Sequence, residues 1–185
     1  MSFNQVQKEI LSELISTLEA VSNEQVDQLI GAIEQADRVF FVGVGRVLLS
    51  LEAVAKRLAH LGVDTVVVGQ ITEPAITEND LLIVGSGSGE SLFPLGITRK
   101  ARSFNAKVAH IGANPKSSMS ELTDYFVRIP VQTKLNLPGE IPSIQPMTSL
   151  FEQSLLLLGD TIALMIIQKN QIDLPKLWQY HANLE

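Results

Sequence analysis

The segment from Asp80 to Ser91 constrains the fold more than any other part of this chain. Its first half, Leu81 to Val84, is an unbroken apolar run, which predicts a strand buried on both faces. The run changes abruptly into alternating glycine and serine. Glycine lets backbone N–H groups approach a ligand closely, and Ser86, Ser88 and Ser91 add hydroxyl donors. Because a helix-like segment follows, we expect this serine loop to bind a phosphate group; a flexible surface turn is the alternative.

Strand and helix patterns alternate along the rest of the chain. Apolar runs predict five strands, at 38–44, 64–68, 80–84, 107–111 and 125–130. Helical spacing predicts helices at 3–20, from Ser22 onward, at 47–61, 92–104, 115–122 and 148–169, and a short piece near Trp178. This alternation is typical of right-handed crossovers and a parallel sheet. The expected fold is therefore α/β, a doubly wound five-stranded parallel sheet flanked by helices.

The length of 185 residues predicts a single domain with three parts. An antiparallel helical hairpin is expected over 1–36, an α/β core over 37–170 and a tail over 171–185. Ligands of such cores bind at the carboxyl ends of the strands, where the serine loop lies. Residues 131–147 contain three prolines and predict an irregular loop.

Composition narrows the classes of partner. Only 18% of residues are charged, below the ~25% of ordinary domains, so we expect part of the surface to be buried in a homo-oligomer. A net charge of −6 argues against non-specific nucleic-acid binding. There is no cysteine, and the three histidines lack metal-ligand spacing, so no metal is expected.

No segment predicts secretion or a membrane span. The N-terminus lacks the apolar stretch of a signal peptide, and the apolar run 155–167 is short and interrupted by Asp160. We therefore expect a cytoplasmic protein that does not bind membranes.

A second glycine motif, Gly43-Val-Gly-Arg46, follows the first predicted strand of the core. A dinucleotide-binding fingerprint would place its third glycine at Leu48, and its ribose-binding acid near Asp64. Because this third glycine is missing, binding of a nicotinamide cofactor is the weaker interpretation of the motif. Arg46 is instead a candidate to hold a phosphate or sugar hydroxyl, or a surface arginine at a helix start.

Few side chains are candidates for acid–base chemistry. Glu152 lies in the first turns of an otherwise apolar helix, where it is either a helix-end carboxylate or, if partly buried, a general base. His60 ends a helix, where a histidine commonly interacts with the helix dipole. His110 lies in a strand and is expected to be packed, and His181 lies in the tail.

Together these motifs resemble the SIS (sugar isomerase) family, and within it the 6-phospho-3-hexuloisomerase branch, over nearly the whole chain. The segments that carry the resemblance are Gly43-Val-Gly-Arg46, Arg57-Leu-Ala-His60-Leu-Gly62, Gly85 to Ser91, Gln145-Pro-Met, Leu150-Phe-Glu-Gln153 and the closing His181-Ala-Asn-Leu-Glu185. The resemblance implies interconversion of D-arabino-hex-3-ulose 6-phosphate and D-fructose 6-phosphate through a cis-enediol, a step of formaldehyde fixation in the ribulose monophosphate pathway. It also implies a homotetramer that uses no cofactor.

The resemblance assigns roles residue by residue. Glu152 and His60 match the acid–base pair, and with the resemblance a site role for His60 outweighs a dipole role. The implied substrate-binding residues are Gly45, Arg46, Ser86, Gly87, Ser88, Gly89, Ser91, Gln145 and His181. In this assignment the loop anchors the phosphate while Glu152 and His60 move protons.

Two residues depart from the family pattern. Val47 and Leu48 follow the Gly-Val-Gly-Arg motif where the family has serine and glycine. Loss of a hydroxyl at position 47 keeps a second hypothesis open, an isomerase of another phosphosugar. A third hypothesis is a non-catalytic sensor of sugar phosphates, although the chain lacks a basic helix-turn-helix segment.

Overall fold

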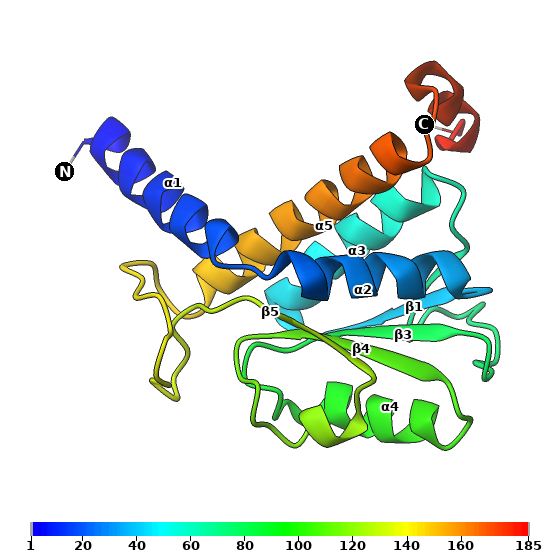
Figure 1. Ribbon diagram of the computed structural model, residues 1–185, viewed down its shortest axis with the longest axis horizontal. Helices are drawn as coiled ribbons and strands as arrows, with labels where there is room; N and C mark the ends of the chain where they lie inside the picture. The colour runs from blue at the N-terminus through cyan, green and yellow to red at the C-terminus, as the bar shows by residue number, and fades with distance from the viewer. Residues whose placement is uncertain (1, 185) are drawn as a thin grey trace.

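A parallel sheet forms the centre of the computed structural model, which describes residues 2–184 (Figure 1). Met1 and Glu185, the two ends of the predicted domain, lie outside the described residues. The strands are β1 (Val39–Val42), β2 (Thr65–Val67), β3 (Leu81–Gly85), β4 (Lys107–Gly112) and β5 (Tyr125–Arg128). Their order is β2-β1-β3-β4-β5, and every neighbouring pair is parallel. The order reverses between β1 and β3, so the topological switch point lies where the two glycine motifs emerge.

Helices cover both faces of the sheet, which confirms the predicted doubly wound α/β fold. One face carries α2 (Asn23–Gln35), α3 (Gly45–Ala59) and α5 (Ser149–Lys169), and the other carries α4 (Leu92–Arg102) (Figure 1). Two hydrophobic cores result, one on each face. Successive strand side chains alternate between them: Phe41 belongs to the larger core and Phe40 to the smaller one.

Helix α5 packs closely against α3. A Cβ atom at Gly159 would collide with the side chain of Val54, so glycine sets the closest approach of the two helices. By length and composition α5 could cross a membrane, but 56% of its most apolar window is buried inside the molecule. Such burial is typical of a core helix.

The two N-terminal helices do not form the expected antiparallel hairpin. Helix α1 (Phe3–Glu19) packs against α5, whereas α2 packs against β5. The apolar stripe of α2 is buried on the sheet and leaves little for α1 to pack on. As a result α1 leads away from the body as an arm (Figure 1).

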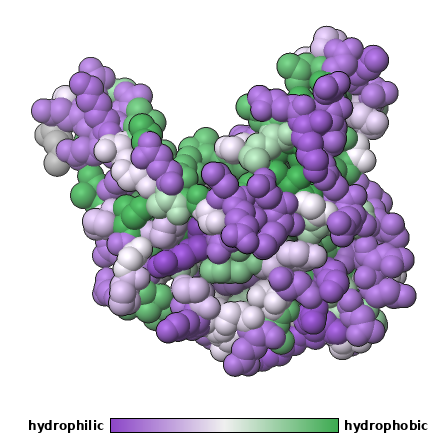
Figure 2. All heavy atoms as spheres, viewed as in Figure 1, coloured by the Kyte–Doolittle hydropathy of each residue, from purple (hydrophilic) through white to green (hydrophobic). Residues whose placement is uncertain are grey.

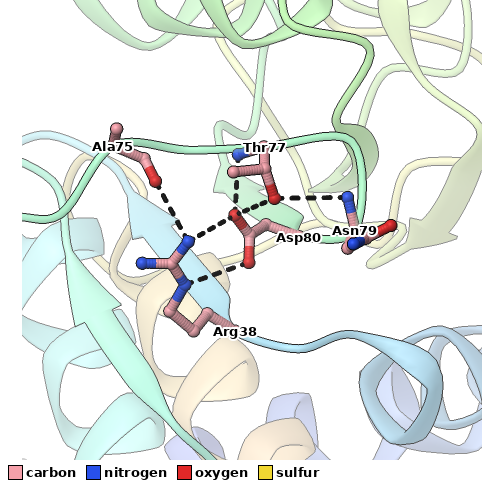
Figure 3. A network of polar contacts seen from close by, with 5 residues as sticks. All are labelled: Arg38, Ala75, Thr77, Asn79 and Asp80. Carbon is pink, nitrogen blue, oxygen red and sulfur yellow. Dashed lines mark hydrogen bonds and ion pairs between the residues drawn. The ribbon is translucent and has the colours of Figure 1, made fainter.

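The connection from β2 to β3 contains no helix, and an ion pair holds its end (Figure 3). Arg38 donates two hydrogen bonds of 3.1 Å to the buried carboxylate of Asp80 and one of 3.1 Å to the carbonyl of Ala75. The Thr77 amide and hydroxyl donate to the same carboxylate at 2.7 and 2.9 Å. This network fixes the amino ends of β1 and β3, opposite the edge that carries the glycine motifs.

Two of the smaller predictions have different outcomes. The short helix in the tail is confirmed as a 3₁₀ segment, η2 (Leu174–Tyr180). The helix predicted over 115–122 is wrong except for a 3₁₀ turn, η1 (Ser120–Leu122). Side chains take the amides that a helix would use: Asn114 accepts from Lys116 N–H at 2.9 Å, and Glu90 accepts from Ser118 N–H at 2.7 Å.

Candidate active site

A cavity of about 720 Å³ opens above the carboxyl ends of β1 and β3. Eight of the predicted site residues line it: Gly45, Arg46, Ser86, Gly87, Ser88, Ser91, Gln145 and Glu152. Sequence reasoning missed several further polar residues: Gln132, Thr133, Lys134, Asn136, Ser143 and Thr148. They lie in or directly after the loop between β5 and α5, whose only sequence signal is a lysine and several polar residues among prolines. We call this cavity the central pocket.

The serine loop is held from within by Ser86. The Ser86 hydroxyl accepts a hydrogen bond from Gly89 N–H at 3.1 Å and donates to Ser91 Oγ at 3.2 Å. Gly89 has a φ of +69°, and a Cβ there would collide with Ser117, so only glycine fits without strain. Gly89 therefore shapes the loop, although it is not itself among the residues that line the pocket.

The remaining donors of the loop stay available to a ligand. Ser88 Oγ accepts from Glu90 N–H at 3.2 Å, and Ser91 Oγ accepts from Ser86, so each hydroxyl keeps its own hydrogen. Within residues 2–184, the amides of Gly87 and Ser88 have no hydrogen-bond acceptor. Because α4 begins directly after Ser91, its amino-terminal dipole adds to the attraction for an anion.

His110 supports the loop from below. Its ring lies fully buried in β4, and Nε2–H donates to the carbonyl of Ser86 at 2.8 Å. Burial lowers the pKa of His110 to about 4, although the hydrogen bond to Ser86 opposes the shift. The prediction of a packed histidine is confirmed, and its ring is neutral near pH 7.

Glu152 lines the same pocket from the first turn of α5. Its side chain is only 10% exposed and forms an ion pair with Arg46. Thr148 Oγ1 donates to the second carboxylate oxygen at 3.4 Å, and Ser50 Oγ donates to the Glu152 carbonyl at 2.9 Å. The neighbouring Phe151 ring lies beneath Gly87, which brings the serine loop and the carboxylate into one pocket.

Arg46 enters the pocket from the start of α3. Gly45 immediately before it has a φ of +58°, which turns the chain from β1 into the helix. The Arg46 side chain is 65% exposed, so its guanidinium contacts both Glu152 and the open pocket. Val47 lies deeper, near Gly85, where a Cβ on that glycine would stand 2.8 Å from Val47 Cγ1.

His60 and His181 lie elsewhere, in a second cavity of about 580 Å³. His60 is the C-cap residue directly after α3, about 20 Å along the helix axis from Arg46 at 1.5 Å per residue. The rings of His60 and His181 stack with centroids 5.3 Å apart, and Trp178 lies against His181. One chain therefore does not bring His60 to Glu152. We call this cavity the histidine pocket.

The histidine pocket carries an exposed ion pair at its edge. Arg57 Nε lies 3.5 Å from Asp160 Oδ1, and both side chains are about half exposed. Asp160 is thus half exposed, although it lies in an otherwise apolar helix. Among residues 2–184, no group of three histidine, aspartate or glutamate side chains is arranged to hold a metal ion.

Known proteins match this chain along most of its length. The SIS domain family matches residues 32–158. The chain is 40% identical over 177 residues to a 3-hexulose-6-phosphate isomerase from Bacillus subtilis (strain 168), covering 96% of each. It is 36% identical over 176 residues to a 3-hexulose-6-phosphate isomerase from Mycobacterium gastri, covering 95% of this chain and 88% of the relative.

Solved structures share the fold. A hypothetical protein from Methanococcus jannaschii superposes with a TM-score of 0.85 at 26% identity, covering 98% of this chain and 99% of that one. Its crystal structure was described as inferring a molecular function of 3-hexulose-6-phosphate isomerase.

Proposed function

Since this chain belongs to the SIS domain family, we propose that it is an isomerase that interconverts D-arabino-hex-3-ulose 6-phosphate and D-fructose 6-phosphate. The observation that carries the proposal is the central pocket itself. It combines a loop of free amides and hydroxyls for a phosphate with a nearly buried carboxylate, Glu152, for proton transfer. The corresponding step belongs to formaldehyde fixation by the ribulose monophosphate pathway, in the cytoplasm, where phosphorylated sugars are retained.

Glu152 is the proposed base. Moving the carbonyl from C3 to C2 requires removal of a proton from C2, formation of a cis-enediol, and delivery of a proton to C3. One carboxylate can perform both transfers on one face of the sugar. Arg46, paired with Glu152 and open to the pocket, is placed to stabilise negative charge that develops on the enediol oxygens.

The serine loop is the proposed anchor. Binding of the distant phosphate through Ser88, Ser91 and the loop amides orients C2 and C3 toward Glu152. Lys134, at the rim of the same pocket, adds a positive charge for the substrate. Through these contacts, binding energy from the phosphate contributes to the rate.

A second group must move a proton between O2 and O3, and we propose His60 for this role. A histidine is suited to it because its ordinary pKa lies near neutrality. Since His60 lies at the far end of α3 from Glu152, it would reach the pocket from another copy of the chain. The complete active site would then be shared between subunits, with His181 beside His60.

Exposed apolar side chains support assembly into a homotetramer. Helix α1 exposes Phe3, Leu11 and Ile15, and the tail exposes Leu174 and Trp178. Figure 2 shows hydrophobic residues in the hollow between α1 and the projection formed by the carboxyl end of α5 and the tail. Large exposed apolar patches are typical of surfaces that bind other protein chains.

Two measurements test the proposal. Hexulose 6-phosphate, made enzymatically, is supplied to the protein and fructose 6-phosphate is followed; absence of turnover refutes the assigned reaction. Mixed assemblies of Glu152→Gln and His60→Asn chains, each strongly impaired alone, should regain full activity in roughly a quarter of their sites. No recovery in verified mixed assemblies would show that the two residues act within one chain or that His60 has no part.

Val47 favours one alternative, isomerisation of another phosphosugar. Its side chain contributes a methyl surface to the pocket wall close to Gly85, where a hydroxyl is expected from the family pattern. A panel of aldose and ketose phosphates separates the two functions. Faster turnover of any other phosphosugar than of hexulose 6-phosphate would favour the alternative.

A further inference from the structure

Helix α1 is connected to the central pocket through one carboxylate, Glu13. It accepts three hydrogen bonds from consecutive residues: Ser143 Oγ–H at 2.7 Å, Ile144 N–H at 2.7 Å and Gln145 Nε2–H at 2.9 Å. Bonds to an ionised acceptor are roughly twice as strong as neutral ones. Burial alone would raise the pKa of Glu13, but these three hydrogen bonds outweigh it and lower the pKa, so the group is charged near neutral pH.

The segment held by Glu13 forms part of the pocket wall. Ser143 and Gln145 both line the central pocket, and they lie in a connection without helix or strand. Gln145 N–H also donates to Ser143 Oγ at 3.1 Å. In Figure 1 this connection, between β5 and α5, runs beside α1. Glu13, on the regular helix α1, therefore holds in place an irregular segment that forms part of the pocket wall.

The carboxylate also decides which way the Gln145 amide points. A carboxylate only accepts hydrogen bonds, so it selects the orientation in which Gln145 Nε2 faces Glu13. The oxygen, Oε1, is then left as an acceptor for a ligand, since in the described part of the chain it accepts no hydrogen bond. An amide oxygen accepts from a hydroxyl and repels a phosphate.

We propose that Glu13 is a positioning residue, which orients Gln145 so that Oε1 accepts a hydrogen bond from a sugar hydroxyl, away from the phosphate anchor. The inference rests on the proposed function, because it takes a phosphosugar as the ligand. It assigns the two polar walls different parts of the substrate: the serine loop binds the phosphate, and the Glu13–Gln145 pair binds the sugar.

The test is calorimetric binding of fructose 6-phosphate and of inorganic phosphate to variants. In Glu13→Gln, the NH₂ group of the new amide replaces one carboxylate oxygen and faces the hydrogen-bond donors that this oxygen accepted from. Gln145 therefore loses its fixed orientation. We expect the Kd for fructose 6-phosphate to rise about tenfold, the worth of one hydrogen bond, while the Kd for inorganic phosphate stays unchanged. Glu9→Gln, on the exposed surface one turn earlier in α1, is the matched control.

A double variant separates positioning from general damage. Gln145→Leu removes the acceptor and should raise the Kd for fructose 6-phosphate by the same factor. The combination Glu13→Gln with Gln145→Leu should be no weaker than Gln145→Leu alone, because both act through one atom. Additive losses, equal losses for sugar phosphate and inorganic phosphate, or an unchanged Kd in Glu13→Gln would each overturn the proposal. Binding without turnover by the natural chain would instead count against the proposed reaction and leave this test intact.

Discussion

The two ends of helix α3 carry two different kinds of pocket. At its amino end, the central pocket is built from strand ends, glycine turns and a nearly buried carboxylate, which hydrogen bonds hold in place. At its carboxyl end, the histidine pocket is lined mostly by apolar residues of α5 and the tail. The first is a site that a single chain organises. The second resembles a surface that another chain would cover.

The helix dipole gives the two ends opposite preferences. The amino end of α3 favours anions, in accord with a phosphorylated substrate near Gly45 and Arg46. The carboxyl end favours cations, and Lys56, Arg57 and His60 lie there. If His60 of one chain serves the central pocket of another, assembly brings the carboxyl end of one α3 toward the amino end of another. The proposed shared site therefore joins the two unlike ends.

The largest expected effect is at the central pocket. Glu152→Gln keeps the shape of the side chain but removes the base, so kcat should fall on the order of 10³-fold with little change in KM. Steady-state kinetics with fructose 6-phosphate measures this loss. The control is Glu121→Gln, an exposed carboxylate in η1. A kcat within a factor of two of the natural chain would remove Glu152 from the chemistry.

The second effect tests whether the histidine pocket belongs to the active site at all. His60→Asn should lower kcat about 100-fold, since general acid–base groups contribute 10²–10⁴-fold, and should leave inorganic phosphate binding intact. Lys56→Gln, one turn earlier on α3 and exposed, serves as control. If His60→Asn kept the kcat of the natural chain, the histidine pocket would not be part of the active site.

Local signals predicted the central pocket well. The change from Val84 to glycine and serine marks a strand end, and parallel topology brings all such ends to one edge of the sheet. Glu152 stood out as an acid within an apolar helix. Each of these features depends on residues adjacent in sequence, which explains why the sequence alone was informative.

Long-range pairings could not be predicted in the same way. The Arg46–Glu152 ion pair joins residues 106 positions apart, and the contact of Glu13 with Gln145 spans 132 positions. The helix predicted over 47–61 already separates Arg46 from His60, but no local pattern shows whether another chain brings His60 to the central pocket. These contacts depend on how helices pack on the sheet, which side-chain spacing along one segment does not encode.

A smaller effect should divide the serine hydroxyls by role. Ser88→Ala removes a hydroxyl that is free to donate to the ligand, so KM for fructose 6-phosphate should rise about tenfold with kcat nearly unchanged. Kinetics beside Ser12→Ala, an exposed serine of α1, provides the measurement and its control. An unchanged KM would place the phosphate elsewhere in the central pocket, and Lys134 would be the next residue to test.

The last prediction concerns His110, which lies beneath the serine loop. We expect its replacement to have the smallest effect on activity but a measurable effect on stability. Its pKa of about 4 in the fold lies below the ordinary 6.5, so the unfolded chain binds a proton first as the pH falls. The free energy of unfolding is therefore unaffected by this group above pH 6.5 and decreases as the pH falls toward 4. Between pH 7.5 and 5 the loss should be about 2 kcal/mol.

Replacement of the ring isolates this contribution. His110→Leu should show a smaller decrease between the two pH values in urea unfolding, and a lower stability at pH 7.5 because the Ser86 carbonyl loses its donor, at about 1 kcal/mol. His181→Gln, exposed in the tail, should follow the natural chain. If His110→Leu and the natural chain lose equal stability, the buried ring does not titrate on unfolding. In that case His110, which supports the central pocket, would differ from the histidines of the histidine pocket only in its place in the fold and not in its effect on the pH dependence of stability.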